Sequence, residues 1–148
     1  MPSIPLETRV ALQDQMTEYC YLVDNIGELD PLLDYFTEDA VLDFSAIGLP
    51  FMNGRADYRK FYSEVFENMS HHTHYLTNFR IDAYDGDSAS TRAYVQGMGR
   101  ANDGNEVLVH VRYTMDFVRE GDQWKCRKYN IYPGMPLPAS LDEIHGDR

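Results

Sequence analysis

Residues 70–78 read Ser-His-His-Thr-His-Tyr-Leu-Thr-Asn, and at this stretch the sequence changes from a helical to a strand pattern. Before it, residues 54–69 carry apolar side chains at helical spacing. After it, the period becomes two, and four strands are predicted over residues 71–84, 88–101, 106–119 and 123–132. Asp85-Gly86-Asp87 and Glu120-Gly121-Asp122 separate strands as turns, which predicts an antiparallel meander.

The strand predicted over residues 106–119 has two distinct faces, because its side chains alternate in character. Its mostly apolar face, from Val107 to Phe117, is expected to lie inward. The other face carries His110, Arg112 and Thr114, and it is expected to be the convex, subunit-facing surface of the sheet.

The N-terminal third predicts helices and one early strand. From Leu6 to Gly27 a helix is indicated by a single apolar stripe, made of Leu12, Met16, Tyr19, Cys20 and Val23. A short helix is predicted over Asp30–Phe36, with Asp30 as the N-cap and Pro31 in the first turn. A strand over Ala40–Phe44 precedes the helix at residues 54–69.

This order of elements predicts an α+β fold: three N-terminal helices and a cone-like curved, mixed or antiparallel sheet enclosing an apolar pocket. We expect one domain over residues 1–148, with a core at about 5–132. The tail, residues 133–148, has three prolines in its first six positions and is expected to leave the sheet and be mobile.

Composition argues against several kinds of partner. The formal net charge is −11, and no basic block exceeds two residues, so neither nucleic acid nor an anionic membrane is expected to bind. Cys20 and Cys126 are not in a CxxC pair, which excludes zinc ribbons and thioredoxin-type sites. No secretory signal is visible at the N-terminus, and no apolar run approaches 18 residues, so a cytoplasmic location is expected.

The candidate for chemistry is a pair formed by Asp24 and His74. A carboxylate at the edge of an apolar helix stripe is costly unless it is paired, although a half-solvated or capping Asp is the alternative. His72, His74, Leu76 and Asn78 share one face of their strand. An Asp beside an imidazole fixes its tautomer and stabilises the imidazolium, so this pair predicts an acid–base dyad.

A metal site is the competing interpretation of the histidine-rich stretch. His72 and His74 could both reach one ion, but no third ligand follows at a known spacing, so no metal is expected. Tyr19, Tyr94, Tyr113 and Tyr129 are each either core residues, subunit contacts or phenols that bind substrate.

Several short motifs together resemble the SnoaL-like branch of the nuclear transport factor 2-like superfamily over about residues 5–132. They are Tyr19-x4-Asp24, Phe36-Thr37-Glu38-Asp39-Ala40-Val41, Gly54, His74-Tyr75-x-Thr77-Asn78 and Gly121-x2-Trp124-Lys125. The family members that this chain is most similar to are dehydratases and a dehydrochlorinase.

The resemblance implies cofactor-independent β-elimination on a cyclic, aromatic or steroid-like molecule, with homotrimers (or homodimers) as the assembly. It implies His74 as general base, Asp24 as its orienting partner and Tyr19 as a phenol near the leaving group or carbonyl. Asn78, Tyr94, Tyr113, Tyr129 and Phe44 are the substrate-binding candidates. An isomerase, a retro-aldol-type lyase and a non-catalytic ligand-binding or assembly module remain alternatives.

Overall fold

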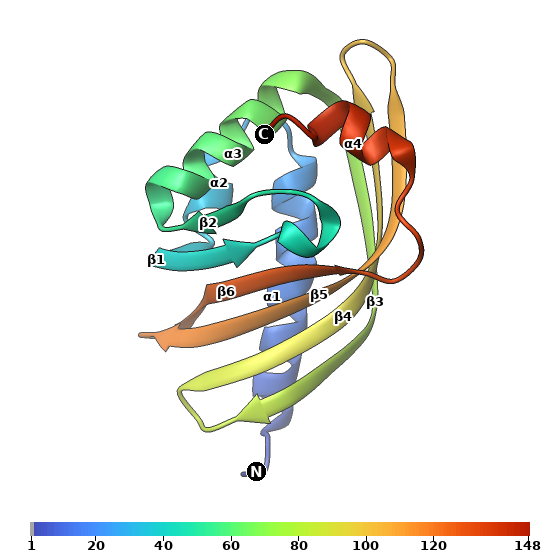
Figure 1. Ribbon diagram of the computed structural model, residues 1–148. Helices are drawn as coiled ribbons and strands as arrows, with labels where there is room; N and C mark the ends of the chain where they lie inside the picture. Colours follow the sequence, from blue (N-terminus) through green and yellow to red (C-terminus); the bar gives the residue numbers. More distant parts are fainter. Residues whose placement is uncertain (1) are drawn as a thin grey trace.

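One curved sheet of six strands forms a wall of the molecule in a computed structural model, which describes residues 2–148 (Figure 1). The strands are β1 (Phe36–Asp43), β2 (Phe51–Asn53), β3 (Met69–Tyr84), β4 (Ser88–Ala101), β5 (Glu106–Glu120) and β6 (Gln123–Pro133). Their order across the sheet is β2-β1-β6-β5-β4-β3. The pairing of β1 with β6 is parallel and the other pairings are antiparallel. The predicted mixed sheet and its meander are confirmed.

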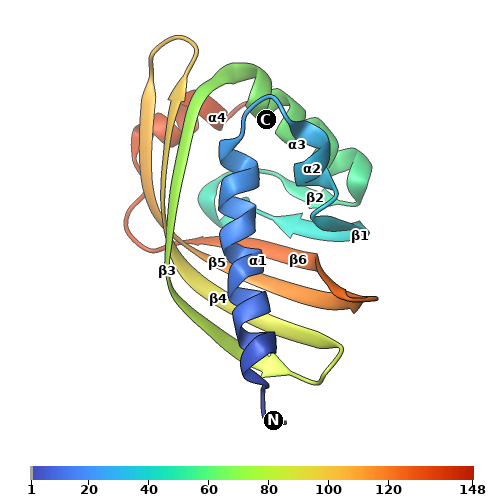
Figure 2. The ribbon, with the colours of Figure 1, turned by 180° about the vertical axis from the view of Figure 1, so that it is seen from behind.

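The helices lie on the concave side and at one end of this sheet. They are α1 (Leu6–Asp24), α2 (Leu29–Leu33), α3 (Arg55–Asn68) and α4 (Ala139–His145), with a 3₁₀ turn at Ser45–Ile47. Figure 2 shows α1 running across the sheet, with α2 and α3 beside β1 and β2. The α+β class with three helices before the meander is therefore confirmed. Within residues 2–148, no helix combines the length and apolar character needed to cross a membrane.

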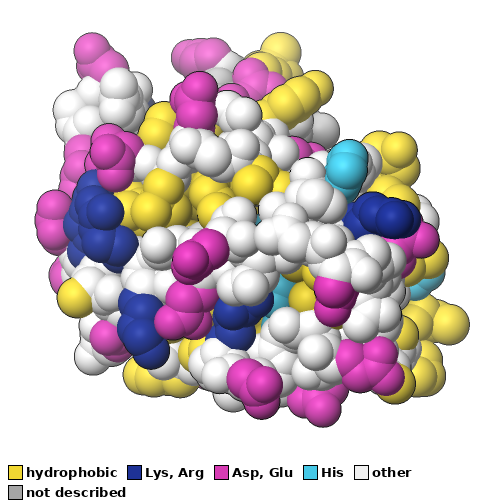
Figure 3. All heavy atoms as spheres, turned by 90° about the horizontal axis from the view of Figure 1, so that it is seen from above, with side chains coloured by type: hydrophobic (Ala, Val, Ile, Leu, Met, Phe, Trp, Pro, Cys, Tyr) yellow, Lys and Arg dark blue, Asp and Glu magenta, His cyan; other side chains and the backbone are white. Residues whose placement is uncertain are grey.

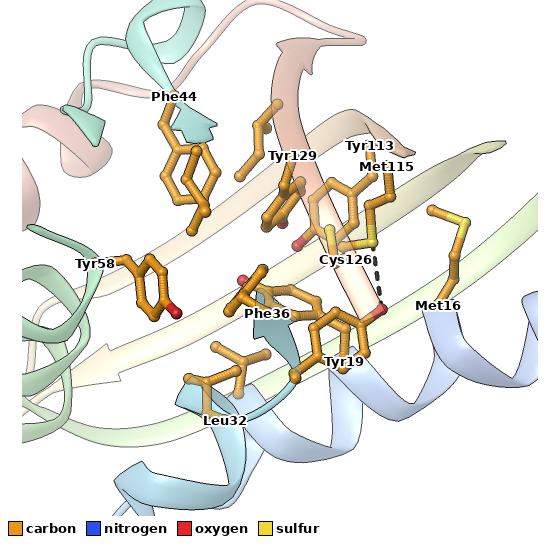
Figure 4. Packing of buried hydrophobic residues seen from close by; sticks show 14 of the residues in the cluster. Met16, Tyr19, Leu32, Phe36, Phe44, Tyr58, Tyr113, Met115, Cys126 and Tyr129 are labelled. Carbon is orange, nitrogen blue, oxygen red and sulfur yellow. Dashed lines mark hydrogen bonds between the residues drawn. The ribbon is translucent and has the colours of Figure 1, made fainter. Parts of the chain in front are cut away.

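The core is rich in aromatic side chains, as Figure 4 shows. The predicted stripe of α1, from Leu12 to Val23, is buried along its whole length. Tyr19 lies at its centre, with its ring centroid 4.9 Å from that of Tyr129 and 5.7 Å from that of Tyr113. Offset and edge-on contacts of this kind add specificity to the burial of large apolar area. These contacts pack α1 against β5 and β6.

The second helix is shorter than predicted. It spans Leu29–Leu33, not Asp30–Phe36, and its N-cap is Glu28 without a side-chain capping bond. Phe36 instead opens β1 and pairs with Cys126 of β6, so β1 begins before Ala40, where the strand was predicted to start. Pairing across the sheet and burial of Phe36 at 2% exposure overrode the local helical pattern.

The tail leaves the sheet after Pro133, as predicted, but it is not an unstructured extension. Residues 139–145 form α4, and Leu141 and His145 are buried by contact with the rest of the chain. α4 lies beside β5 at the end of the molecule where α3 joins β3 (Figure 1). This helix covers the open end of the space between α1 and the sheet.

Candidate active site

Asp24 and His74 lie in direct contact. The Asp24 Oδ1 atom is 2.5 Å from His74 Nδ1, and Asp24 Oδ2 accepts the backbone N–H of His74 at 3.1 Å. The side chains are 24% and 15% exposed, respectively. A carboxylate can only accept, so His74 Nδ1 carries a proton and the neutral ring leaves its Nε2 lone pair free.

The position of the pair follows from how α1 meets β3. Asp24 is the last residue of α1, and β3 is an edge strand whose outer N–H groups have no sheet partner. The carboxylate satisfies one such donor while holding the ring of the same residue. Burial of the α1 stripe fixes the rotation of the helix, and this rotation directs Asp24 toward β3.

His72, one pleat earlier on the same face, is held in a parallel way. Its Nδ1–H donates to the carbonyl oxygen of Val23 at 2.9 Å, and this carbonyl belongs to the last turn of α1. Burial lowers the pKa of His72 from its ordinary value. The neutral ring therefore also keeps a free Nε2 lone pair.

Two glycines of β4 make room for these rings. Gly97 pairs with His74, and Gly99 pairs with His72. A Cβ atom on Gly97 would lie 3.2 Å from His74 Cδ2 and 3.3 Å from His74 Nε2, closer than ordinary van der Waals contact. The two glycines of this Gly-x-Gly pattern therefore leave room for the histidine rings and do not form a nucleotide-binding loop.

A cavity of about 110 Å³ lies between α1, α3, α4 and the concave face of the sheet. It is lined mainly by apolar side chains, with His74, His72 and His145 along one wall. Other lining residues are Tyr19, Val23, Phe44, Ile47, Leu49, Phe61, Tyr62, Val65, Met69, Met98, Val107, Val109, Val111, Tyr113, Ile131 and Leu141. Figure 3 shows the end of the molecule nearest this cavity, where acidic side chains are spread between hydrophobic ones.

Tyr19 lines the cavity. Its hydroxyl is 2.8 Å from the hydroxyl of Tyr62, which lines the same cavity from α3. Burial raises the pKa of both phenols well above its ordinary value, so both remain protonated. The two hydroxyls share one hydrogen bond, which leaves one O–H proton free to donate to a third oxygen.

The predicted substrate-binding residues divide into two groups. Phe44 and Tyr113 line the cavity directly. Tyr129 lies behind them, with its ring centroid 4.9 Å from that of Phe44 and 5.0 Å from that of Tyr113. Its hydroxyl is buried with no hydrogen-bond partner within residues 2–148. Tyr129 therefore shapes the wall and does not contact the open space.

Tyr94 and Asn78 are not at the cavity. Tyr94 pairs with Arg112 in β5, and antiparallel partners share a face, so Tyr94 lies on the convex side. Its ring packs under the Arg112 guanidinium at 4.9 Å. Asn78 lies in an irregularity between Thr77 and Arg80 with a φ of 58°, and it is exposed. The irregularity ends the alternation that predicted Asn78 beside His74.

Tyr62, His145 and Gly97 are among the cavity residues that were not singled out from the sequence. Tyr62 belongs to an apolar helix stripe, in which a phenol looks like core. His145 lies in the tail, far in sequence from every other site residue. Gly97 has no side chain that could mark a site, and its role follows only from its register with His74.

The histidine wall does not form a metal site in the part of the chain that the structure describes. No group of three or more His, Cys, Asp or Glu side chains lies in an arrangement able to hold an ion. His72 and His74 have ring centroids 5.9 Å apart, and both Nδ1 atoms are already bonded to α1.

Comparison with solved structures finds close matches to the whole fold. A protein from Novosphingobium aromaticivorans with the provisional name aromatic ring hydroxylase is 48% identical, with a TM-score of 0.92 over 96% of this chain and 99% of that one. A protein from the same species, provisionally named scytalone dehydratase, is 22% identical, with a TM-score of 0.79 over 88% and 86%. A hexachlorocyclohexane dehydrochlorinase from Novosphingobium barchaimii is 22% identical, with a TM-score of 0.74 over 90% and 92%.

The two more distant relatives show the fold alone, while the family is shown by sequence. No curated protein matches this chain significantly. The family model of the SnoaL-like domain matches residues 5–130, which include Asp24, His74 and every strand of the sheet up to the middle of β6. The chain belongs to the SnoaL-like family.

Proposed function

We propose that this protein is a cofactor-independent lyase that removes water from a small cyclic or aromatic hydroxy-carbonyl compound. The observation that carries the proposal is the Asp24–His74 pair, in which Nδ1 of His74 is held and Nε2 is left beside an apolar cavity. A fixed imidazole lone pair in a site that excludes water is suited to proton abstraction.

The proposed reaction is a β-elimination in two proton transfers. His74 Nε2 removes a proton from the carbon next to the carbonyl, and the electron pair forms the double bond as the β-hydroxyl leaves. The His74 imidazolium, stabilised by Asp24, returns that proton to the departing hydroxide, which forms water. The free O–H of the Tyr19–Tyr62 pair donates a hydrogen bond to the carbonyl oxygen or the leaving group.

The names of two of these relatives refer to elimination, whereas the name of the 48% identical relative refers to hydroxylation of an aromatic ring. One carries the name scytalone dehydratase and another the name hexachlorocyclohexane dehydrochlorinase, and both names describe removal of a small molecule from a ring. The relative with 48% identity carries a name that refers to an aromatic ring. All three therefore favour a ring-shaped substrate in the cavity of this chain.

The volume of the cavity limits the size of the substrate that it can hold. A volume of about 110 Å³ is comparable to apolar cavities that hold a single benzene ring. A one-ring substrate therefore fits this volume, whereas a steroid-like molecule exceeds it.

The proposal is tested with a panel of one-ring and two-ring β-hydroxyketones, followed by ultraviolet absorbance for a new conjugated double bond. We expect turnover by the native chain, and a loss of about 10²–10⁴-fold in kcat/KM for His74→Ala and Asp24→Asn. His71→Ala is the matched control, because His71 is exposed and points away from the cavity.

Unchanged turnover in His74→Ala would exclude His74 as the base. A product with a shifted double bond and no loss of water would favour the isomerase alternative, and a cleaved carbon–carbon bond would favour a retro-aldol lyase. Ligand binding without turnover of any compound would favour a non-catalytic binding module.

A further inference from the structure

His145 brings a third imidazole to the cavity from outside the region that the family model matches. It is the last residue of α4, it is 9% exposed, and it lines the same cavity as His74. The family match ends at residue 130, so this side chain belongs to a part of the chain that the resemblance does not describe.

The C-terminal arginine determines which nitrogen of His145 carries a proton. Arg148 Nε–H points to His145 Nδ1 at 3.3 Å, and a guanidinium has donors but no acceptor. His145 Nδ1 must therefore be unprotonated, and the proton of the neutral ring is on Nε2. Arg148 is only 11% exposed, and its guanidinium lies 3.8 Å from the Glu64 carboxylate, so its position is fixed from α3.

His145 is also held in the neutral state. Burial, with the nearby positive charge of Arg148, lowers its pKa to about 4. At neutral pH it therefore offers one N–H donor, on Nε2, on the side of the ring away from Arg148.

That donor is unpaired and reachable. Within residues 2–148, His145 Nε2 has no hydrogen-bond partner. The fully buried polar side-chain atoms that lack a partner are Tyr129 Oη and Asn130 Oδ1, and His145 Nε2 is not among them. Nε2 thus retains accessible surface, and His145 is one of the residues that line the cavity.

The other two histidines that line the cavity carry their proton on the opposite ring nitrogen. Their Nδ1–H groups are bonded to Asp24 and to the carbonyl of Val23, so His74 and His72 each present a lone pair at Nε2. In the neutral form of the three rings, His145 is then the imidazole that donates at Nε2.

We propose that His145 is a substrate-binding residue whose Nε2–H donates a hydrogen bond to an acceptor oxygen, such as a ketone or aldehyde, on the ring compound held in the cavity. The inference rests on the proposed function only in placing that compound beside His74. Binding at this donor does not require turnover.

The first test reads the tautomers by long-range ¹H–¹⁵N NMR at neutral pH. The expected result is a proton on Nε2 for His145 and on Nδ1 for His72 and His74. A proton on Nδ1 of His145 would overturn the proposal.

The second test compares two probes of the same shape, acetophenone and α-methylstyrene, in which a carbonyl oxygen is replaced by a methylene group. Their Kd values are measured by calorimetry for the native chain, His145→Phe, His145→Gln and, as a control on the exposed side of the same helix, Glu143→Gln. The ratio of the two Kd values cancels general changes in the shape of the cavity.

We expect His145→Phe to shift that ratio about five- to tenfold against acetophenone, the effect of one buried hydrogen bond. His145→Gln, which keeps an N–H near the position of Nε2, should retain most of the preference, as should Glu143→Gln. An unchanged ratio in His145→Phe would overturn the proposal. If His145→Phe displaces α4, the ratio in His145→Gln decides, because a merely structural role predicts the same shift in both variants.

His74→Ala separates this inference from the proposed function. It should lower kcat/KM about 10²–10⁴-fold while leaving the ratio of the Kd values for the two probes unchanged. Absence of dehydratase activity in every variant would contradict the proposed reaction and leave the donor role of His145 standing on the binding data.

Discussion

At the scale of single residues, the site depends on a glycine, Gly97, whose lack of a side chain leaves room for the ring of His74. The ring of His74 lies over Gly97 of the neighbouring strand, and any Cβ there would come within 3.3 Å of both His74 Nε2 and Val109 Cγ2. Gly97 has no left-handed backbone angle, so it is present for space and not for conformation. The free lone pair of His74 therefore relies on the absence of that methyl group.

Gly97→Ala should accordingly lower kcat/KM while the sheet remains folded, because the ring of His74 has to move away from the added methyl group. The loss should be smaller than the roughly 10²-fold that a displacement of about 1 Å causes. Gly99→Ala is the matched comparison, since its Cβ would meet Met69 Cε at 2.7 Å and His72, but not His74. Steady-state kinetics on the same substrate, with thermal unfolding as a check on stability, measure both. A greater loss in Gly99→Ala would contradict the assignment of His74 as base.

The candidate residues that the structure brings together at the cavity are those whose position follows from one element. Tyr19 and Asp24 lie on a helix stripe whose buried face is clear from spacing, and His74 follows from the alternation that starts at residue 70. Tyr94 and Asn78 were misplaced because their faces depend on pairing register and on an irregularity in β3. Neither feature leaves a mark in a single sequence that distinguishes inward from outward.

At the scale of elements, α4 is the helix that was not predicted from the sequence. The strands were predicted within a few residues, because long alternation and Gly-containing turns specify them locally. The prolines between Pro133 and Pro138 indicated only that the chain leaves the sheet. A helix of seven residues has too few turns to show a periodic stripe, and its stability comes from packing of Leu141 and His145 onto the cavity wall.

Acid should weaken the docking of α4. The pKa of His145 is lowered to about 4 in the docked helix, whereas a detached, solvated histidine has its ordinary value of about 6.5. Between these values the detached form binds more protons, so docking is fully present above pH 6.5 and is lost as the pH falls toward 4. The groups facing His145 are His72 on β3 and Arg148, which is held by Glu64 on α3.

The difference between the pKa values of His145 in the docked and the detached helix corresponds to about 3 kcal/mol of docking free energy. Hydrogen exchange of the amides of residues 139–145, measured across this pH range and corrected for intrinsic exchange, should show falling protection while the β4–β5 amides remain protected. In His145→Phe most of the pH dependence should disappear, and the remainder belongs to His72, whose pKa is also lowered by burial. Constant protection of α4 down to pH 4 would contradict the prediction.

At the scale of the whole molecule, the convex face of the sheet exposes large apolar side chains that nothing in residues 2–148 of one copy of the chain covers. Thr77, Tyr94, Arg112 and Tyr132 lie in register across β3, β4, β5 and β6. Around this row the large apolar side chains are exposed, with Tyr75 at 58%, Tyr94 at 47% and Leu108 at 45%. Contiguous exposed apolar surface of this kind marks an interaction site in soluble proteins. We therefore propose that the convex face joins copies of this chain in a homotrimer, with a homodimer as the alternative.

Tyr94→Asp should convert the proposed oligomer into monomers, because it places a carboxylate in the centre of the apolar row and removes the ring that packs under Arg112. Tyr21→Asp is the matched control: Tyr21 is 71% exposed, but it lies on α1, on the other side of the sheet. Sedimentation equilibrium at low and high salt measures the mass of each. Because each copy carries a net charge of −11, association of the native chain should strengthen with salt, which screens repulsion between copies while the apolar contact remains. A native chain that stays monomeric at every salt concentration, or an unchanged mass in Tyr94→Asp, would contradict the convex face as the interface.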